Sequence, residues 1–306
     1  MFLQRVQASL PRARALSTSA RSLRFLIVEG YSPEGRAELQ RGGATIASEL
    51  YANVLKSVSP MAVTTDVLHP ADGPFQAPDL SKYDGVVWTG CSLTVYETDD
   101  ERTVRQIDLA KQIYAYGVPQ FGSCWAAQIA VFAAGGKVAK NPNGREMGIS
   151  RKIQLTPEGR SHPMYEGKST VFDAFTSHYD EITHVLPGGL TLSANAFTST
   201  QSVAVRHLNG DFWAVQYHPE YDLREMARLI YCRREKLTKY GNFASVDDAC
   251  RFVDDLETLH ANPSRYDIAW RLGIDDDVLD ENIRLCEARN FVKHLVVPYK
   301  LAKAWP

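Results

Sequence analysis

The sequence is poor in cysteine, and the cysteines it has are not paired. Among 306 residues there are five, with no Cys-x-x-Cys arrangement: Cys91, Cys124, Cys232, Cys250 and Cys286. An odd number of scattered cysteines argues against a disulfide framework and against a zinc site of the usual spacing. The histidines show no metal-ligand spacing either. We therefore expect no metal and no cofactor, and we interpret Cys232, Cys250 and Cys286 as buried thiols in a reducing compartment.

Long apolar runs and clusters of one charge are also missing. No apolar stretch approaches the roughly 20 residues that a membrane-spanning helix needs. Lysine and arginine (34) nearly balance aspartate and glutamate (36), which gives a net charge of −2, and no basic stripe alternates with aromatic residues. These absences argue against a membrane or a nucleic acid as the main partner. Apolar residues make up 44% of the chain, which is enough for a sizeable core without disulfide bonds or metal sites to stabilise it.

The first 22 residues contain no acidic side chain. They are rich in serine and carry four arginines, Arg5, Arg12, Arg14 and Arg21. This composition is typical of organelle transit peptides, and no apolar stretch is long enough for a secretory signal. We predict a mitochondrial presequence over residues 1–22, the alternative being a basic tail of no function.

Apolar segments after residue 22 alternate between two lengths. The short ones predict strands over residues 23–28, 62–68, 84–88 and 118–121, and the longer amphipathic ones predict helices over 34–56, 101–116 and 126–134. Strands that alternate with helices indicate an α/β fold with a doubly wound, mostly parallel sheet. Short β-rich segments follow, which predict antiparallel additions over 149–155, 169–175, 191–194, 203–207 and 212–217.

The last part of the chain has a helical pattern throughout. The expected helices lie near 222–240, 246–260, 265–272 and 277–296. We predict a main domain over 23–225 and an all-helical extension over 226–306. The extension either packs on the main domain or forms a dimer interface. Trp88, Trp213 and Trp270 are interpreted as core residues.

Cys124 lies where a strand pattern runs directly into a helix pattern, in VPQFGSCWAAQIAVFAAGG. A sharp strand-to-helix turn places a side chain at the carboxyl edge of a parallel sheet, where open α/β folds bind ligands. The N–H groups of the following helix favour the thiolate form of a cysteine at its start. Cys124 is therefore a candidate nucleophile, and a structural cysteine is the alternative on local sequence alone.

A second segment supplies the partners that a thiolate nucleophile needs. FWAVQYHPEYD places His218 and Glu220 at the end of another apolar strand. A nucleophilic thiol requires an imidazole that takes and returns a proton, and a carboxylate orients that imidazole. His218 and Glu220 are two residues apart, so we expect the carboxylate to reach the ring. The three side chains predict a Cys-His-Glu triad.

The strand-to-helix turn that carries Cys124, called the elbow below, and the triad residues together resemble the class I, triad-type glutamine amidotransferases. The elbow of that family is usually Gly-x-Cys-x-Gly-x-Gln, and here residues 122–128 read GSCWAAQ; the family's His-Pro-Glu motif is unchanged at 218–220. The resemblance covers roughly residues 24–225 and implies a flavodoxin-like sheet. It also implies that Cys124, His218 and Glu220 are catalytic.

The resemblance carries further roles to individual residues. It implies an oxyanion hole made by the backbone N–H groups of Gly90 and Trp125, and a glutamine-binding role for Gln128. Residues 177–180, Ser-His-Tyr-Asp, resemble the segment whose backbone holds the glutamine α-amino and α-carboxylate groups; this assigns substrate binding to Ser177, His178 and Tyr179. We expect this segment to be a loop. The turn at 141–146 (NPNGRE) is a further candidate for the pocket border.

One position departs from the family pattern. Ala126 replaces the glycine that usually follows the nucleophile by two residues, and its methyl group is expected to narrow the pocket or to change what fits there. This bears on strict glutamine specificity more than on the nucleophilic chemistry.

The activity implied by the resemblance is release of ammonia from the glutamine side chain through a γ-glutamyl thioester. The extension has no Gly-rich phosphate loop and no synthetase motif, so any enzyme that accepts the ammonia would be a separate chain. The alternative is a γ-glutamyl hydrolase acting on γ-glutamyl amides or peptides. A catalytically silent interaction module is a third reading, against which the complete triad argues.

Overall fold

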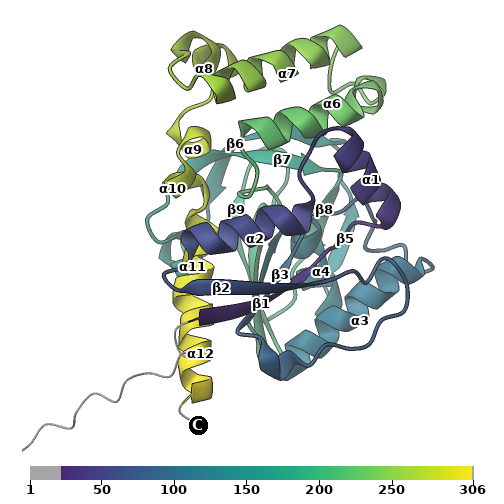
Figure 1. The fold of residues 1–306 in the computed structure, drawn as a ribbon, viewed down its shortest axis with the longest axis vertical. Coiled ribbons are helices and arrows are strands. Elements are labelled where there is room, and N and C mark those ends of the chain that lie inside the picture. Colours follow the sequence, from purple (N-terminus) through teal and green to yellow (C-terminus); the bar gives the residue numbers. More distant parts are fainter. Residues whose placement is uncertain (1–21, 305–306) are drawn as a thin grey trace, which may run out of the picture.

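The computed structural model describes residues 22–304 (Figure 1). The predicted transit peptide therefore lies, except for Ser22, outside the described residues. In the described range the main sheet has nine strands. In spatial order they are β2 (Ala62–Leu68), β1 (Ser22–Val28), β3 (Gly85–Trp88), β4 (Gln120–Ser123), β11 (Gly210–Val215), β10 (Ser202–His207), β9 (Gly189–Ala194), β6 (Glu146–Leu155) and β7 (Val171–His178).

The sheet is parallel on one side and antiparallel on the other. Strands β2, β1, β3, β4 and β11 pair in parallel, and β10, β9, β6 and β7 continue the sheet in antiparallel fashion. A parallel sheet needs crossover helices, and these cover both of its faces. The predicted α/β class with antiparallel additions is confirmed.

Alternation along β1 shows how the two faces are buried. Leu26 and Val28 belong to one apolar cluster, which also contains side chains of α3 (Glu101–Tyr116) and α4 (Trp125–Ala133). Phe25 and Ile27 belong to a second cluster, with side chains of α2 (Ala47–Val58) and α11 (Cys286–Phe291). Successive residues of a strand point to opposite faces, so the central strands are apolar throughout.

The helix predicted over 34–56 is wrong, because two helices occupy this range. Helix α1 (Pro33–Arg41) ends at Gly42, and α2 begins at Ala47. Gly43 has a φ of 77°, and the Ala44 N–H donates to the Leu39 carbonyl at 3.0 Å. This closure of a helix end requires a left-handed residue, which glycine adopts without strain.

Several short elements were not predicted. Strands β5 (Lys137–Lys140) and β8 (Asp180–His184) pair antiparallel in a small second sheet. Each is too short to show a reliable apolar period. The remaining short helical turns of the main domain are η2 (Leu80–Lys82), α5 (Pro157–Ser161) and η3 (Pro163–Tyr165).

The helical extension packs on the main domain. Figure 1 shows α6 (Leu223–Lys239) and α7 (Val246–Ala261) side by side above the sheet, followed by α8 (Tyr266–Leu272) and a return along the side of the domain. On the return path Phe291 is fully buried and stacks on Phe121, with ring centroids 5.3 Å apart. The extension is thus part of the same apolar core. No helix among residues 22–304 is long and apolar enough to cross a membrane.

Two predictions about the extension are wrong. The single helix expected at 277–296 is a series of short segments, α9 (Asp276–Leu279), α10 (Glu281–Arg284), α11 and the π-helical turn η4 (Val292–Val296). Helix α12 (Val297–Ala304) follows. Asp280 interrupts the series, because its side chain accepts a hydrogen bond from the Asn282 N–H and caps a new helix. Trp270 is 79% exposed and is not a core residue. Trp88 and Trp213 are buried as expected.

Candidate active site

The elbow at Cys124 has the backbone that its sequence predicts. Strand β4 ends at Ser123, α4 begins at Trp125, and Cys124 between them has φ 55° and ψ −101°. A non-glycine residue rarely adopts this conformation, and such strain is typical of functional positions. The Cys124 N–H donates to the Val215 carbonyl of β11 at 2.7 Å, which fixes the turn against the neighbouring strand.

Ala126 packs behind the elbow, and the expected narrowing of the pocket by its methyl group is wrong. Ala126 is fully buried in the apolar cluster and does not line the cavity. A Cβ at Gly122 would lie 2.5 Å from the Ala126 methyl and 2.3 Å from the Trp88 carbonyl oxygen. The methyl group therefore lies behind the elbow, close to Gly122, and outside the cavity lining.

His218 and Glu220 meet Cys124 beyond the end of β11. His218 Nδ1 lies 2.7 Å from Glu220 Oε1, and both side chains are buried. The Ser123 hydroxyl donates to the same carboxylate oxygen at 2.7 Å, and the Tyr221 ring stacks on the imidazole with centroids 4.2 Å apart. The carboxylate thus fixes one ring nitrogen, and the stacked tyrosine fixes the plane of the ring.

The electrostatics at His218 favour the imidazolium form. Burial opposes protonation, but the charge of Glu220 and hydrogen bonds with Cys124 and Glu220 raise the pKa of His218 to about 10. An imidazolium beside the thiol stabilises a thiolate. The geometry therefore suits an imidazolium at His218 that lies beside the Cys124 thiol at neutral pH.

Two backbone N–H groups beside the thiol are unused. In the part of the chain that the structure describes, the amides of Gly90 and Trp125 donate no hydrogen bond. A Cβ at Gly90 would lie 3.0 Å from His218 Cε1, so glycine allows this loop to approach the imidazole. The loop is held by Glu29, which is fully buried and accepts a hydrogen bond from the Thr89 hydroxyl at 3.2 Å.

A cavity of about 350 Å³ opens at Cys124. Gln128, Ser177 and Tyr179, which the sequence assigns to substrate binding, all line it. The Ser177 carbonyl accepts a hydrogen bond from the Cys124 thiol at 3.6 Å. The structure therefore brings the predicted nucleophile and these three residues to one cavity.

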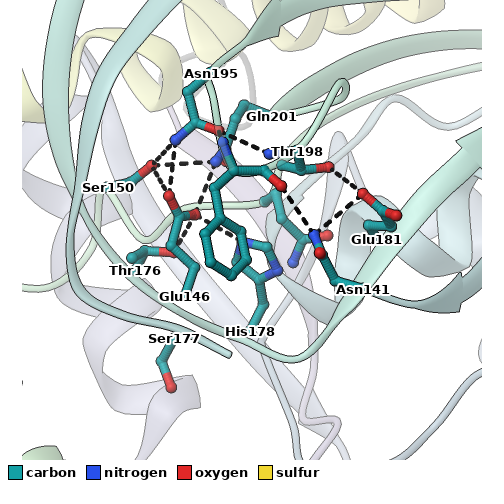
Figure 2. A network of polar contacts seen from close by, with 12 residues as sticks. Asn141, Glu146, Ser150, Thr176, Ser177, His178, Glu181, Asn195, Thr198 and Gln201 are labelled. Atoms are coloured by element: carbon teal, nitrogen blue, oxygen red, sulfur yellow. Dashed lines mark hydrogen bonds and ion pairs between the residues drawn. The ribbon is translucent and has the colours of Figure 1, made fainter. Parts of the chain in front are cut away.

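His178 also borders this cavity, but its ring is engaged behind it. The ring lies in a polar network centred on Glu146, from which the Ser177 side chain points away (Figure 2). His178 Nε2 lies 2.8 Å from Glu146 Oε2, and Nδ1 lies 2.9 Å from the Asp180 carbonyl oxygen. In the segment 177–180, which was predicted as a loop, Ser177 and His178 end strand β7 and Asp180 begins β8. Alternation along β7 separates the Ser177 side chain from the His178 ring.

Several residues at the site were not predicted from the sequence. Tyr31 follows β1, Arg145 belongs to the turn at 141–146, and Arg233 belongs to α6; all three line the cavity. Only the turn carried a signal in the sequence, and its predicted place at the border is confirmed. Among residues 22–304 there is no group of three or more His, Cys, Asp or Glu side chains that could hold a metal ion.

Comparison with known proteins identifies the family. The family described as glutamine amidotransferase class-I matches residues 48–233. A γ-glutamyl-L-1-hydroxyisopropylamide hydrolase of a Pseudomonas species is 31% identical over 282 residues, which cover 90% of this chain and 94% of that protein. The glutamine-hydrolysing GMP synthase of Wolinella succinogenes is 31% identical over 136 residues, 44% of this chain and 24% of that protein.

A solved structure shares the fold. A glutamine amidotransferase from Thermotoga maritima superposes with a TM-score of 0.63 at 16% identity, and the match covers 90% of this chain and 98% of that one. The chain belongs to the class-I glutamine amidotransferase family. The predicted family is thereby confirmed, together with the class of cysteine-dependent hydrolase.

Proposed function

We propose that this protein hydrolyses γ-glutamyl amides through a Cys124–His218–Glu220 triad and a γ-glutamyl thioester. The observation that carries the proposal is the buried imidazole, held by Glu220 at 2.7 Å and facing a strained cysteine at the mouth of a cavity of about 350 Å³. Ligand pockets of roughly 300–1,000 Å³ hold molecules of drug size, so the cavity has room for a γ-glutamyl group and an amine portion.

The reaction follows from the positions of the groups. The Cys124 thiolate attacks the γ-carbonyl carbon, and the developing oxyanion accepts hydrogen bonds from the amides of Gly90 and Trp125. His218 then gives its proton to the amide nitrogen, the C–N bond breaks, and a thioester remains. Next His218 removes a proton from water, which attacks the thioester and releases glutamate and the thiolate. Gln128 and the backbone near Ser177 hold the γ-glutamyl end.

The amine portion distinguishes two versions of the proposal. With glutamine the leaving group is ammonia, as the glutamine-hydrolysing relatives suggest. With a substituted amide the leaving group is an amine, as the name of the Pseudomonas relative suggests, and that relative matches the chain over nearly its whole length. We favour substituted amides. Release of ammonia to an acceptor enzyme on a separate chain is the second candidate.

A panel of amides separates the two candidates. Full-chain protein is incubated with L-glutamine and with γ-glutamyl-L-1-hydroxyisopropylamide, and ammonia, amine and glutamate are quantified. We expect both to be cleaved, with the larger kcat/KM for the substituted amide. A larger kcat/KM for glutamine would favour the ammonia-supplying candidate, and turnover of neither compound would contradict the proposed function.

The pH profile tests the role of Glu220. His218 must be protonated to give its proton to the leaving amine, so kcat/KM should fall as pH rises through about 10, the raised pKa of His218. Glu220→Gln removes the negative charge that favours the imidazolium, so this fall should move to lower pH. At neutral pH we expect kcat to drop by up to about 10⁴-fold, the size of effect known for a lost triad carboxylate.

A control variant keeps the charge of Glu220 and removes a neighbouring hydroxyl group. The Tyr51 hydroxyl lies 3.5 Å from Glu220 Oε2, so Tyr51→Phe should leave the alkaline fall close to that of the unmodified protein. An alkaline fall at the same pH in Glu220→Gln would show that Glu220 does not set the protonation of His218.

We also propose that residues 1–22 direct the chain to mitochondria. The support is compositional: four arginines, abundant serine and no acidic residue. A fluorescent reporter fused behind these residues should reach mitochondria in a cell that imports such presequences. A variant with all four arginines changed to alanine should stay outside. Equal distribution of the two reporters would contradict the proposal.

A further inference from the structure

One wall of the cavity comes from the helical extension. Four residues of α6 line it at the spacing of one helix face: Arg233, Lys236, Leu237 and Tyr240, the last capping the helix. Three of the four lie beyond residue 233, where the match to the family ends. The tip of this wall reaches the substrate-binding segment, since the Tyr240 and Tyr179 rings are 6.5 Å apart. Most of this wall therefore lies beyond the residues that the family description matches.

Arg145 faces this wall without an acidic partner. Its Nη1 donates to the Ser177 hydroxyl at 3.2 Å, and its Nε is buried and unpaired. Within residues 22–304 no carboxylate lies within 4 Å of its guanidinium. Burial and the nearby positive charge of Arg233 lower the pKa of Arg145. A partly buried cation repelled by a second cation is the arrangement expected where an anion binds.

The charges that line the cavity do not balance. Arg145, Arg233 and Lys236 supply three cations, and Glu38 and Asp180 are the acidic residues of the lining. Arg233 Nε lies 3.6 Å from Glu38 Oε1. Asp180 accepts a hydrogen bond from the Tyr96 hydroxyl at 2.9 Å, and burial raises its pKa. The cavity therefore has an excess of positive charge beside its nucleophile.

The γ-glutamyl group cannot neutralise this excess. Its α-carboxylate is balanced by its own α-ammonium group, so this end of any γ-glutamyl amide adds no net charge. A complementary charge must then come from the other side of the amide bond. A carboxylate is the natural partner, because two guanidinium groups bind it through parallel, charge-assisted hydrogen bonds.

We propose that the preferred substrates are γ-glutamyl amides whose amine portion carries a carboxylate, such as γ-glutamyl amino acids, and that Arg145, Arg233 and Lys236 bind that carboxylate. The inference rests on the proposed function and names its substrate class. In this proposal the extension takes part in substrate binding, since α6 supplies two of the three cations.

A matched pair of substrates tests the proposal. γ-Glutamyl-L-1-hydroxyisopropylamide and γ-glutamyl-L-alanine share one skeleton and differ in a hydroxymethyl group against a carboxylate. With the full chain we expect kcat/KM to be about tenfold or more higher for γ-glutamyl-L-alanine, the effect of one or more charge-assisted hydrogen bonds. An equal or higher kcat/KM for the hydroxyisopropylamide overturns this inference alone. Cleavage of neither overturns the proposed function, and this inference with it.

Variants assign the preference to the cations. Lys236 is exposed, so Lys236→Gln should fold, and Arg145→Gln removes the unpaired guanidinium. Each should lower the ratio of the two kcat/KM values about tenfold or more. Lys239→Gln is the matched control, because Lys239 is exposed on the same helix but does not line the cavity. A ratio that stays constant in both cavity variants overturns the assignment.

Discussion

Cys124→Ala should abolish hydrolysis of γ-glutamyl amides, with kcat falling by about 10⁴-fold or more, because no acyl-enzyme can form. The variant should fold normally, since alanine is smaller than cysteine and the elbow strain is a property of the backbone. Hydrolysis is measured as release of glutamate under saturating substrate, and the near-ultraviolet circular dichroism spectrum checks the fold.

A second thiol in the cavity provides the control. Cys91 also lines the cavity, but burial raises the pKa of its thiol well above the usual range, which disfavours its thiolate. Cys91→Ala should therefore keep most of the activity. If Cys91→Ala were inactive and Cys124→Ala active, the nucleophile would be misassigned.

Phe291→Ala should destabilise the protein by about 3–5 kcal/mol, the usual cost of removing a buried phenylalanine. Phe291 is fully buried and stacks on Phe121 of β4, the strand that leads into the elbow. Because the residue lies in the extension, the loss would be measured in the unfolding of the whole chain. Urea titration with linear extrapolation gives the free energy of unfolding.

The matched control is the exposed aromatic residue of the same extension. Trp270 is 79% exposed, so Trp270→Ala should change the free energy of unfolding by no more than about 0.5 kcal/mol. A similarly small effect of Phe291→Ala would mean that the helical extension does not pack on the sheet in solution.

Local sequence signals were sufficient to predict an element where residues that favour its first turn and its end are both present. The predicted helix 101–116 coincides with α3, because the Asp100 side chain caps its first turn and Gly117, with φ 97°, ends it. The elbow was predictable for a similar reason. An apolar strand, the Gly-Ser-Cys turn and a helix of small residues follow one another directly, and each favours the same backbone.

The parts that were missed depend on contacts between distant segments. Arg145 and Arg233 are brought to one cavity from a turn and from the extension, and no sequence spacing relates them to Cys124. The break after α1 is a different case, since Gly42-Gly43 marks it, but the apolar period continues across it and favours one helix. Periodicity reports burial, and a chain can keep one buried face through a turn.

His178 shows that the side chains of neighbouring motif residues need not share one role. The motif assigned Ser177 and His178 alike to the substrate, but in a strand neighbouring side chains point to opposite faces. The Ser177 side chain is contacted by Arg145, whereas the His178 ring joins the network of Glu146 in Figure 2.

Detection of the acyl-enzyme tests the proposed nucleophile, Cys124, most directly. Full-chain protein is mixed with γ-glutamyl p-nitroanilide, an activated amide chosen so that the thioester forms faster than water cleaves it. The reaction is stopped with acid and the intact protein is analysed by mass spectrometry. We expect a mass increase of one γ-glutamyl group on the peptide that contains Cys124. The adduct should be removed by hydroxylamine and absent in Cys124→Ala. Turnover without this adduct, or an adduct on another residue, would contradict this assignment.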